Sequence, residues 1–246
     1  MINFWKNLFS GVSQFKFLWF LMLLYIIIIL MANWYNARIV QFLSIATDAG
    51  TIIFPITFMV SNLITEVYGY KFARKAIWFG FLFNIAFIIY GLVIIHMDSP
   101  DFAVDNHMFD KIFSMNIWII VASFVSYWCS EPTNSYVMAK VKLFTHGRFI
   151  WFRFVFSTVV ASFFDSIIFT HIAFSKLFDY ETIWSLILAM WLVKVIIEIA
   201  GLLISIPAAT KLKDYEGVDR YDIGTKFAIF STECKYLKET NKYNEL

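Results

Sequence analysis

Long apolar runs alternate along the chain with short polar segments. A helix that crosses a bilayer needs about 20 predominantly apolar residues, and six runs come close to that length. The pattern predicts an all-α integral membrane protein, with six transmembrane helices in a single membrane domain over residues 1–246 and a short cytoplasmic tail at 208–246. The predicted helices span about 17–35, 42–64, 76–96, 116–138, 150–174 and 183–207.

The overall composition agrees with this pattern. Hydrophobic residues make up 60% of the 246-residue chain and charged residues 15%, against roughly 45–50% and about 25% in soluble domains. A separate soluble domain is therefore not expected. The first apolar run is too long for the core of a signal peptide, and no small-residue cleavage site follows it, so it is expected to be a retained anchor helix.

Basic residues concentrate in every second loop, in the N-terminal segment and at the start of the tail. The loop between the third and fourth predicted helices is instead acidic. Because positively charged loops stay on the cytoplasmic side of a membrane, we expect both termini to be cytoplasmic. The basic residues are Lys6, Lys16, Lys71, Arg74, Lys75, Lys140, Lys142, Arg148, Lys211 and Lys213, and the acidic ones are Asp98, Asp101, Asp105 and Asp110.

Four of the predicted helices carry ionisable or carboxamide side chains inside their apolar runs. Such groups are expensive in hydrocarbon, so each is expected to face a partner or a wet cavity. Most are spaced three or four residues apart on their helix, which places them on one face. Four polar faces predict a shared, wet, polar cavity, as in a small-molecule transporter. The candidate substrate-binding residues are Asn62, Glu66, Glu131, Asn134, Arg153, Asp165, Lys194 and Glu198.

Structural roles are the alternative for these side chains. Lys194 and Glu198, four residues apart, could simply neutralise each other. Arg153 lies near a loop, from which a long side chain can reach lipid phosphate. Glu66 and Glu131 would serve equally well as static ties between helices.

No motif in the chain indicates an enzyme. The sequence has neither a P-loop nor a G-x-S-x-G motif, so no catalytic residue is predicted. The histidines and cysteines are not spaced as metal ligands, so no metal and no other cofactor is expected. No basic tract indicates a nucleic-acid partner. The histidines are His96, His107, His146 and His171, and the cysteines are Cys129 and Cys234.

Three blocks of sequence resemble one transporter family. The first reads TEVYGYK at 65–71, the second EPTNSYVMAKVK at 131–142, and the third WFR at 151–153 followed by DSIIF at 165–169. In this order and spacing they are similar to the queuosine precursor transporter family, also called the vitamin uptake transporter family. The resemblance extends over about 54–227.

The resemblance implies uptake of a 7-deazaguanine precursor of queuosine, such as 7-cyano-7-deazaguanine, across the bacterial inner (plasma) membrane. The precursor would then be used for tRNA modification. It also implies a fold similar to the substrate-binding subunits of energy-coupling-factor vitamin transporters. The expected partners are this small molecule and the lipid bilayer, while a homo-oligomer or an energy-coupling partner is left open. Uptake of another vitamin-like heterocycle and a non-transporting structural role are the alternative functions.

Two positions depart from the family pattern. Asn62 stands where the family usually has Asp, and Ser162 stands where Glu or Gln is expected. A guanine-like edge offers two N–H donors, and a carboxylate can accept both. Since Asn62 lacks the charge, the strong acceptor is expected to be Glu131 or Glu66, with a basic side chain of the fifth or sixth predicted helix donating to the ring carbonyl.

Overall fold

A computed structural model describes residues 12–36, 38–42, 45–100, 105–115, 117–228, 230–231 and 236–243. Most of the described chain is helical, and one short hairpin interrupts the helices. The helices are α2 (Leu18–Tyr35), α3 (Ala49–Ile53), α4 (Pro55–Tyr68), α5 (Tyr70–Ile94), α6 (Asn106–Met115), α7 (Ile117–Phe144), α8 (Ile150–Phe174) and α9 (Tyr180–Glu216), and the strands are β1 (Ile39–Phe42) and β2 (Ile45–Asp48).

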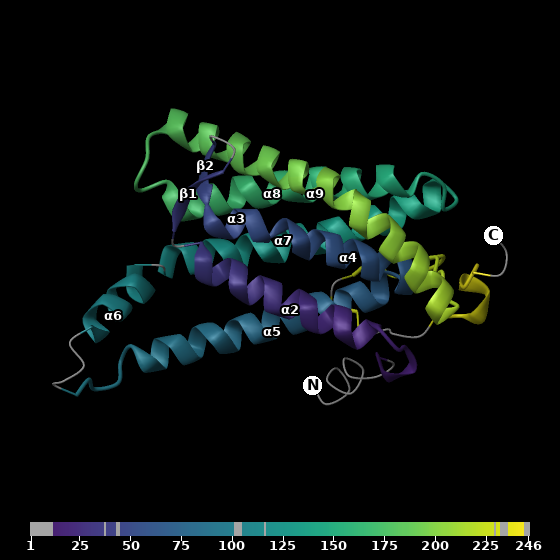
Figure 1. The fold of residues 1–246 in the computed structure, drawn as a ribbon, viewed down its shortest axis with the longest axis horizontal. Coiled ribbons are helices and arrows are strands. Elements are labelled where there is room, and N and C mark those ends of the chain that lie inside the picture. The colour runs from purple at the N-terminus through teal and green to yellow at the C-terminus, as the bar shows by residue number, and fades with distance from the viewer. Residues whose placement is uncertain are drawn as a thin grey trace.

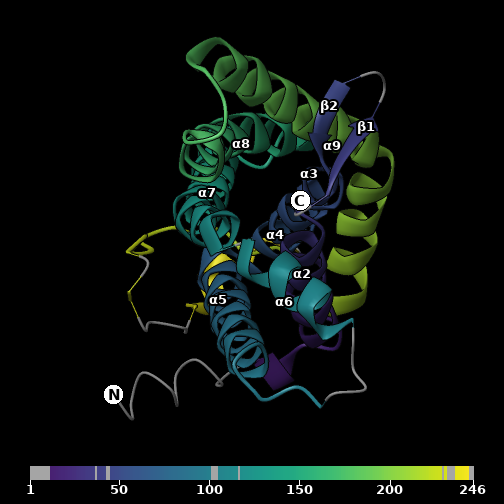
Figure 2. The same ribbon diagram turned by 90° about the vertical axis from the view of Figure 1, so that its left-hand side faces the viewer.

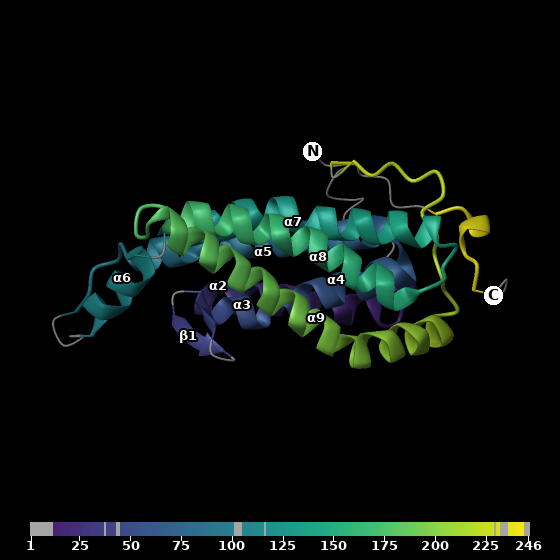
Figure 3. The ribbon, with the colours of Figure 1, turned by 90° about the horizontal axis from the view of Figure 1, so that it is seen from above.

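Within the described residues, five helical stretches are long and apolar enough to cross a membrane. They are α2, α3 together with α4, α5, α8 and α9. These helices run roughly along the long axis of the molecule. α7 packs beside α8 and also lies along this axis (Figure 1, Figure 3). The chain is therefore an α-helical, multi-pass membrane protein.

α4 lies at the centre of the bundle. It contacts α2, α5, α7, α8 and α9, and a view along the bundle places it among them (Figure 2). Its apolar side chains Val60, Ile64 and Val67 belong to a core shared with α2 and α5. The polar side chains of α4 consequently face the other side, toward α7, α8 and α9.

The hairpin was not predicted from the sequence. β1 and β2 pair antiparallel, with Ile39 opposite Asp48, whereas the apolar pattern predicted a helix from about residue 42. The helix begins instead at Ala49, because the side chain of Asp48 accepts a hydrogen bond from the backbone N–H of Thr51 at 2.7 Å and caps the first turn. The hairpin therefore occupies the beginning of the segment that was predicted as the second helix.

Three other helix ends differ from the predicted ones. α5 begins near residue 70 rather than 76, because Gly69 (φ 89°) ends α4 and the next helix starts at once. α7 continues to Phe144 rather than ending near residue 138. α9 passes through Pro207, its predicted end, and stops where Gly217 takes the left-handed conformation (φ 62°). Basic residues that were expected in loops therefore lie in helices.

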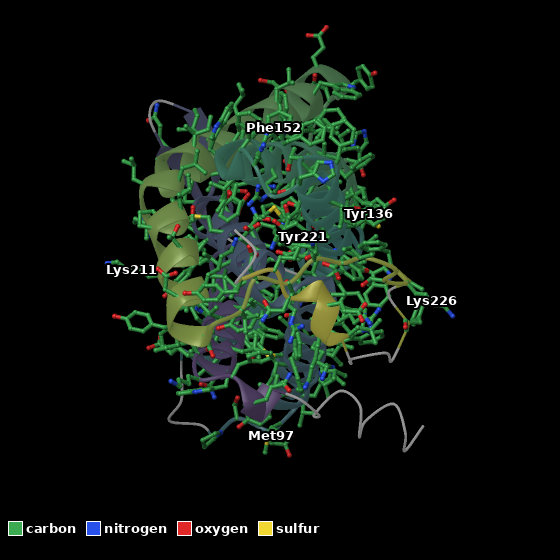
Figure 4. The ribbon with its side chains drawn as sticks, turned by 90° about the vertical axis from the view of Figure 1, so that its right-hand side faces the viewer. Met97, Tyr136, Phe152, Lys211, Tyr221 and Lys226 are labelled. Carbon is green, nitrogen blue, oxygen red and sulfur yellow. The ribbon has the colours of Figure 1, made fainter. Side chains whose placement is uncertain are left out.

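The bundle has two distinct ends. At one, which we call the tail end, α4, α7 and α9 finish, α2 begins, and Tyr221 of the following segment lies near the middle (Figure 1, Figure 4). The backbone N–H of Phe17 donates to Glu216 there at 2.7 Å, which ties the start of α2 to the end of α9. At the other, which we call the hairpin end, β1, β2 and α6 lie.

The chain places its basic segments at the tail end. Three groups of described basic residues lie near helix ends located there. They are at 71–75, near the start of α5, at 140–148, around the end of α7, and at 211 and 213, near the end of α9. Lys6 and Asp101, which also entered the orientation prediction, lie outside the described residues. The described acidic residues Asp98, Asp105 and Asp110 lie toward α6, at the hairpin end.

Gly69→Ala is expected to destabilise the protein. An added Cβ would lie 2.3 Å from the hydroxyl oxygen of Tyr236, and a φ of 89° is unfavourable for a residue with a Cβ. Thermal unfolding in detergent should show a loss of about 1–3 kcal/mol from the backbone alone, with the collision added to it. Gly224→Ala is the matched control, because Gly224 also has a positive φ (67°) but nothing within 4 Å of the added Cβ. Equal losses in the two variants would contradict the close approach of Tyr236.

Candidate functional site

Asn62 is the hub of a buried hydrogen-bond network that joins four helices. Its Nδ2 on α4 donates to Glu198 Oε1 of α9 at 3.2 Å and to Thr158 Oγ1 of α8 at 3.4 Å. Its Oδ1 accepts from Asn134 Nδ2 of α7 at 3.0 Å and from Ser157 Oγ of α8 at 3.2 Å. We call these five residues the Asn62 cluster. They are all completely buried, so the cluster places polar groups of four helices in direct contact.

Three oxygens at and near the cluster accept no hydrogen bond from the described residues. They are Asn134 Oδ1, Glu198 Oε2 and Glu131 Oε2. The other oxygen of Glu131 accepts from Thr57 Oγ1 at 2.7 Å, which fixes the orientation of the carboxyl group. A buried acceptor without a donor costs about 1–3 kcal/mol. Glu131, Asn134 and Glu198 therefore each keep a buried oxygen that can still accept a hydrogen bond.

Glu66 and Arg153 form a fully occupied ion pair nearer the tail end. Arg153 Nε and Nη2 donate to the two Glu66 oxygens at 2.8 and 2.6 Å, and Arg153 Nη1 donates to the carbonyls of Gly147 and Arg148. Lys213 Nζ adds a third contact to Glu66 at 2.5 Å. Arg153 is 1% exposed, so the interpretation that it reaches lipid phosphate is wrong. Its guanidinium is fully engaged within the protein, as is the Glu66 carboxylate.

A second acidic residue extends this tie to the chain beyond α9. Asp219 Oδ1 accepts from Lys142 Nζ at 2.6 Å and lies 2.9 Å from Lys213 Nζ. Lys142 also donates to the backbone carbonyl of Glu66. Two acids and three bases from α4, α7, α8, α9 and the following segment therefore form one network, which we call the tail-end tie. It is composed of Glu66, Lys142, Arg153, Lys213 and Asp219.

The segment after α9 is fastened to the α4–α5 junction by further contacts. The backbone N–H of Arg220 donates to the carbonyl of Val67 at 3.1 Å. Asp222 accepts from the backbone N–H of Tyr70 at 2.9 Å and from the hydroxyl of Tyr236 at 2.5 Å. Burial raises the pKa of Asp222. These contacts, together with the tail-end tie, close the bundle at this end.

Asp165 and Lys194 form a third polar group toward the hairpin end. Lys194 Nζ of α9 donates to Asp165 Oδ2 of α8 at 2.6 Å and to Ser166 Oγ at 3.1 Å, and Ser130 Oγ of α7 donates to Asp165 Oδ1 at 3.2 Å. The interpretation that Lys194 and Glu198 neutralise each other is therefore wrong. They share a helix face, but that face lies against other helices, and each side chain binds a partner there.

The structure packs the polar residues together, and this corrects the prediction of a wet cavity around them. In the described chain, the cavity that Asp165 and Lys194 border has a volume of about 20 Å³, which is space for about one water molecule. A larger cavity of about 230 Å³ lies between α2, α5, α6 and α7, and none of the eight candidate residues borders it. In this conformation the polar faces satisfy mainly one another.

Sequence reasoning missed several members of these networks. Ser157 lies four residues after Arg153 and eight before Asp165, a spacing that places it on the same helix face, but it was not among the predicted residues. Thr158 lies beside that face. Lys142 and Lys213 entered only the orientation prediction, because nothing in the sequence indicates that they meet Glu66 and Asp219 across long separations.

Comparison with known proteins establishes the family. The family model described as "Putative vitamin uptake transporter" matches residues 48–208. The chain belongs to this family. It is thus a membrane transporter for a small molecule and not an enzyme, as the absence of catalytic motifs predicted, and the resemblance noted in the sequence is confirmed.

Two named relatives are similar over most of their length. The "Probable queuosine precursor transporter" of Bacillus subtilis (strain 168) is 26% identical over 185 residues, which cover 74% of this chain and 78% of the relative. The "Queuosine precursor transporter" of Escherichia coli (strain K12) is 26% identical over 172 residues, or 68% of this chain and 73% of the relative. No solved structure matches the chain significantly.

Breaking the Glu66–Arg153 pair from one side should destabilise the protein severely. Arg153→Met leaves a buried carboxylate short of its main partner, so we expect a loss of about 3–5 kcal/mol in unfolding free energy. The double variant Glu66→Gln/Arg153→Met should lose less than the sum of the single variants, because the pair is coupled. Unfolding in detergent, followed for all three variants, measures this coupling.

The control for this cycle is Lys211→Met. Lys211 lies on the same helix as Lys213 but is exposed, so its replacement should change the unfolding free energy by no more than about 0.5 kcal/mol. Additive losses for Glu66→Gln and Arg153→Met would mean that the two side chains do not act as a pair.

Proposed function

We propose that this transporter carries a 7-deazaguanine precursor of queuosine inward across the bacterial inner membrane. In this proposal α7 is the sixth transmembrane helix, both termini are cytoplasmic, and the bundle is similar to the substrate-binding subunits of energy-coupling-factor vitamin transporters. The names of both relatives support the substrate class. The basic residues at the tail end support the orientation, since positively charged segments stay in the cytoplasm.

The observation that carries the proposal is the set of three buried oxygens without donors, on Glu131, Asn134 and Glu198. A guanine-like ring presents N1–H and an exocyclic amine along one edge. Any further N–H donor of the ring also needs a hydrogen-bond acceptor as its partner. Carboxylate and carboxamide oxygens accept such donors, and bonds to a charged acceptor are the stronger ones. Glu131 and the Asn62 cluster together are therefore matched in hydrogen-bonding character to this class of ring.

The arrangement of the polar groups suggests a route. The tail-end tie closes the cytoplasmic side, so the substrate approaches from the hairpin end. It passes Asp165 and Lys194 and then reaches the Asn62 cluster, where the helices separate to admit it. Glu66 and Arg153 are not ligands in this proposal, because their hydrogen bonds are already made within the protein. They hold α4 against α8 while the centre rearranges.

Binding of a 7-deazaguanine should raise the thermal stability of the purified protein. A ligand that binds only the folded state adds about RT ln(1 + [L]/Kd), roughly 2.7 kcal/mol at a hundredfold excess over Kd. We would measure Tm in detergent with 7-cyano-7-deazaguanine, its aminomethyl analogue, queuine and guanine. A shift with one deazaguanine and none with guanine is the expected result. A shift only with unrelated vitamin-like heterocycles would replace the proposed substrate class by another.

Glu198→Gln should impair uptake while leaving the fold intact. The substitution keeps the oxygen that accepts from Asn62 but replaces the free carboxylate oxygen by an amide that donates. Loss of a hydrogen bond to a charged group is worth about 1.5–3 kcal/mol, so kcat/KM for uptake should fall roughly tenfold to hundredfold. Initial rates with labelled 7-cyano-7-deazaguanine in inverted and right-side-out vesicles measure this.

The control for this substitution is Ser205→Ala. Ser205 is also buried on α9, but its hydroxyl donates to the carbonyl of Gly201 in its own helix at 3.0 Å. Uptake by this variant should equal that of the unmodified protein. If Glu198→Gln transported equally well at normal expression, the carboxylate would not contact the substrate.

A further inference from the structure

A second cavity lies outside the polar networks above. It has a volume of about 230 Å³ and lies between α2, α5, α6 and α7, in the half of the bundle toward the hairpin end. Three aromatic and two isoleucine side chains line it, and two carboxamide side chains, Asn33 and Asn84, border it. A void left by imperfect packing would be lined by apolar side chains. This cavity instead has a deeply buried carboxamide, that of Asn84, at its border.

Asn33 and Asn84 present one free acceptor and one free donor to the cavity. Asn33 Nδ2 donates to Asn84 Oδ1 at 2.9 Å. That bond leaves Asn33 Oδ1 and Asn84 Nδ2 without a hydrogen-bond partner among the described side chains and backbone. Exchanging oxygen and nitrogen in both carboxamides would again leave one acceptor and one donor. Asn84 is only 1% exposed, so its side chain has little access to bulk water.

Aromatic rings form the walls beside this pair. Trp34 of α2 lies 6.1 Å from Phe87 of α5 and 6.5 Å from Phe113 of α6, measured between ring centroids. The α6 ring approaches α5 so closely at Gly91 that a Cβ there would lie 2.0 Å from Phe113 Cζ. Flat rings of this kind provide stacking surfaces for another flat ring.

The chemistry of the walls distinguishes between two kinds of occupant. A lipid acyl chain would match the apolar part of the walls, but it would offer no hydrogen bond to the Asn33 carbonyl or the Asn84 amide, which is unfavourable in an apolar setting. A planar heterocycle with a neighbouring N–H donor and carbonyl acceptor, such as a lactam edge, would satisfy both Asn33 and Asn84 and would stack on the rings. The cavity volume is below the roughly 300 Å³ at which drug-sized sites begin, and so suits a small ring system.

We propose that this cavity, which we call the reception site, binds the planar heterocyclic substrate before it reaches the Asn62 cluster. The inference rests on the proposed function for the identity of the ring. Asn33 also borders the small cavity at Asp165 and Lys194. A ring that leaves the reception site past Asn33 therefore meets this ion pair next, and the Asn62 cluster lies beyond it.

The size of the two cavities supports this order of events. The space at Asp165 and Lys194 holds about one water molecule in this conformation, whereas the reception site is already open. The substrate can therefore be held at the reception site first, while the central helices are still packed against one another. Transfer to the Asn62 cluster follows when they separate.

The test uses uptake of labelled 7-cyano-7-deazaguanine by vesicles that contain Asn84→Leu or Asn33→Leu. Leucine has a similar size but neither donates nor accepts. Both variants should raise KM about tenfold, the effect of roughly one lost hydrogen bond, with the maximal rate largely retained. Each leucine variant also removes the hydrogen bond between Asn33 and Asn84, so its Tm without ligand should fall somewhat, and the KM comparison uses variants that insert normally. Asn84→Asp, which keeps the acceptor for Asn33 but loses the donor, should raise KM in the same way and serves if a leucine variant does not insert.

Ile88→Leu is the matched control, since Ile88 borders the same cavity and the change alters shape but not polarity. Its KM should stay as in the unmodified protein. If the unmodified protein takes up the substrate while the asparagine variants keep its KM, the reception site is refuted and the proposed function stands. If the unmodified protein takes up no deazaguanine at all, both the proposed function and this inference fail.

Discussion

Hydrocarbon offers no hydrogen bonds, so every polar group at membrane depth must find its partner within the protein. In this transporter that requirement falls on α4, the central helix, whose polar face meets α7, α8 and α9. The single side chain of Asn62 forms hydrogen bonds with side chains of all three helices. The relative positions of the four helices depend on these contacts, because apolar surfaces packed in lipid do not by themselves choose one register.

The hydrogen bonding of the polar groups differs between the tail end and the centre of the bundle. At the tail end, both oxygens of Glu66 and all three guanidinium nitrogens of Arg153 take part in hydrogen bonds within the protein. In the centre, Asn134 and Glu198 each keep an oxygen without a donor. A buried acceptor without a donor lowers the stability of the protein, and a ligand that supplies donors would remove this cost. A rigid closed end and an unsatisfied centre suit a transporter in which the middle opens while one end holds.

Much of this arrangement could be predicted from the sequence, and the limits have physical reasons. Periodicity identified the polar faces, because three- and four-residue spacing survives any arrangement of helices. It could not name partners across helices, so Lys194 was matched with Glu198 on its own helix instead of with Asp165 on α8. The predicted helix boundaries were wrong where a single residue determines the boundary. The Asp48 cap delays the start of α3 and thereby permits the hairpin, and Gly69 separates two helices with no loop between them.

If the Asn62 cluster opens to receive the substrate, a thiol placed within the cluster becomes accessible to a reagent in water. Ser157→Cys, in a background with Cys129→Ala and Cys234→Ala, would be exposed to a small water-soluble thiol reagent in vesicles that transport. We expect slow labelling that substrate at about a hundredfold its Kd suppresses, and no labelling of Ser205→Cys, which lies outside the cluster. Labelling of the Ser157→Cys thiol at one rate with and without substrate, while uptake proceeds, would mean that the substrate does not bind in the Asn62 cluster.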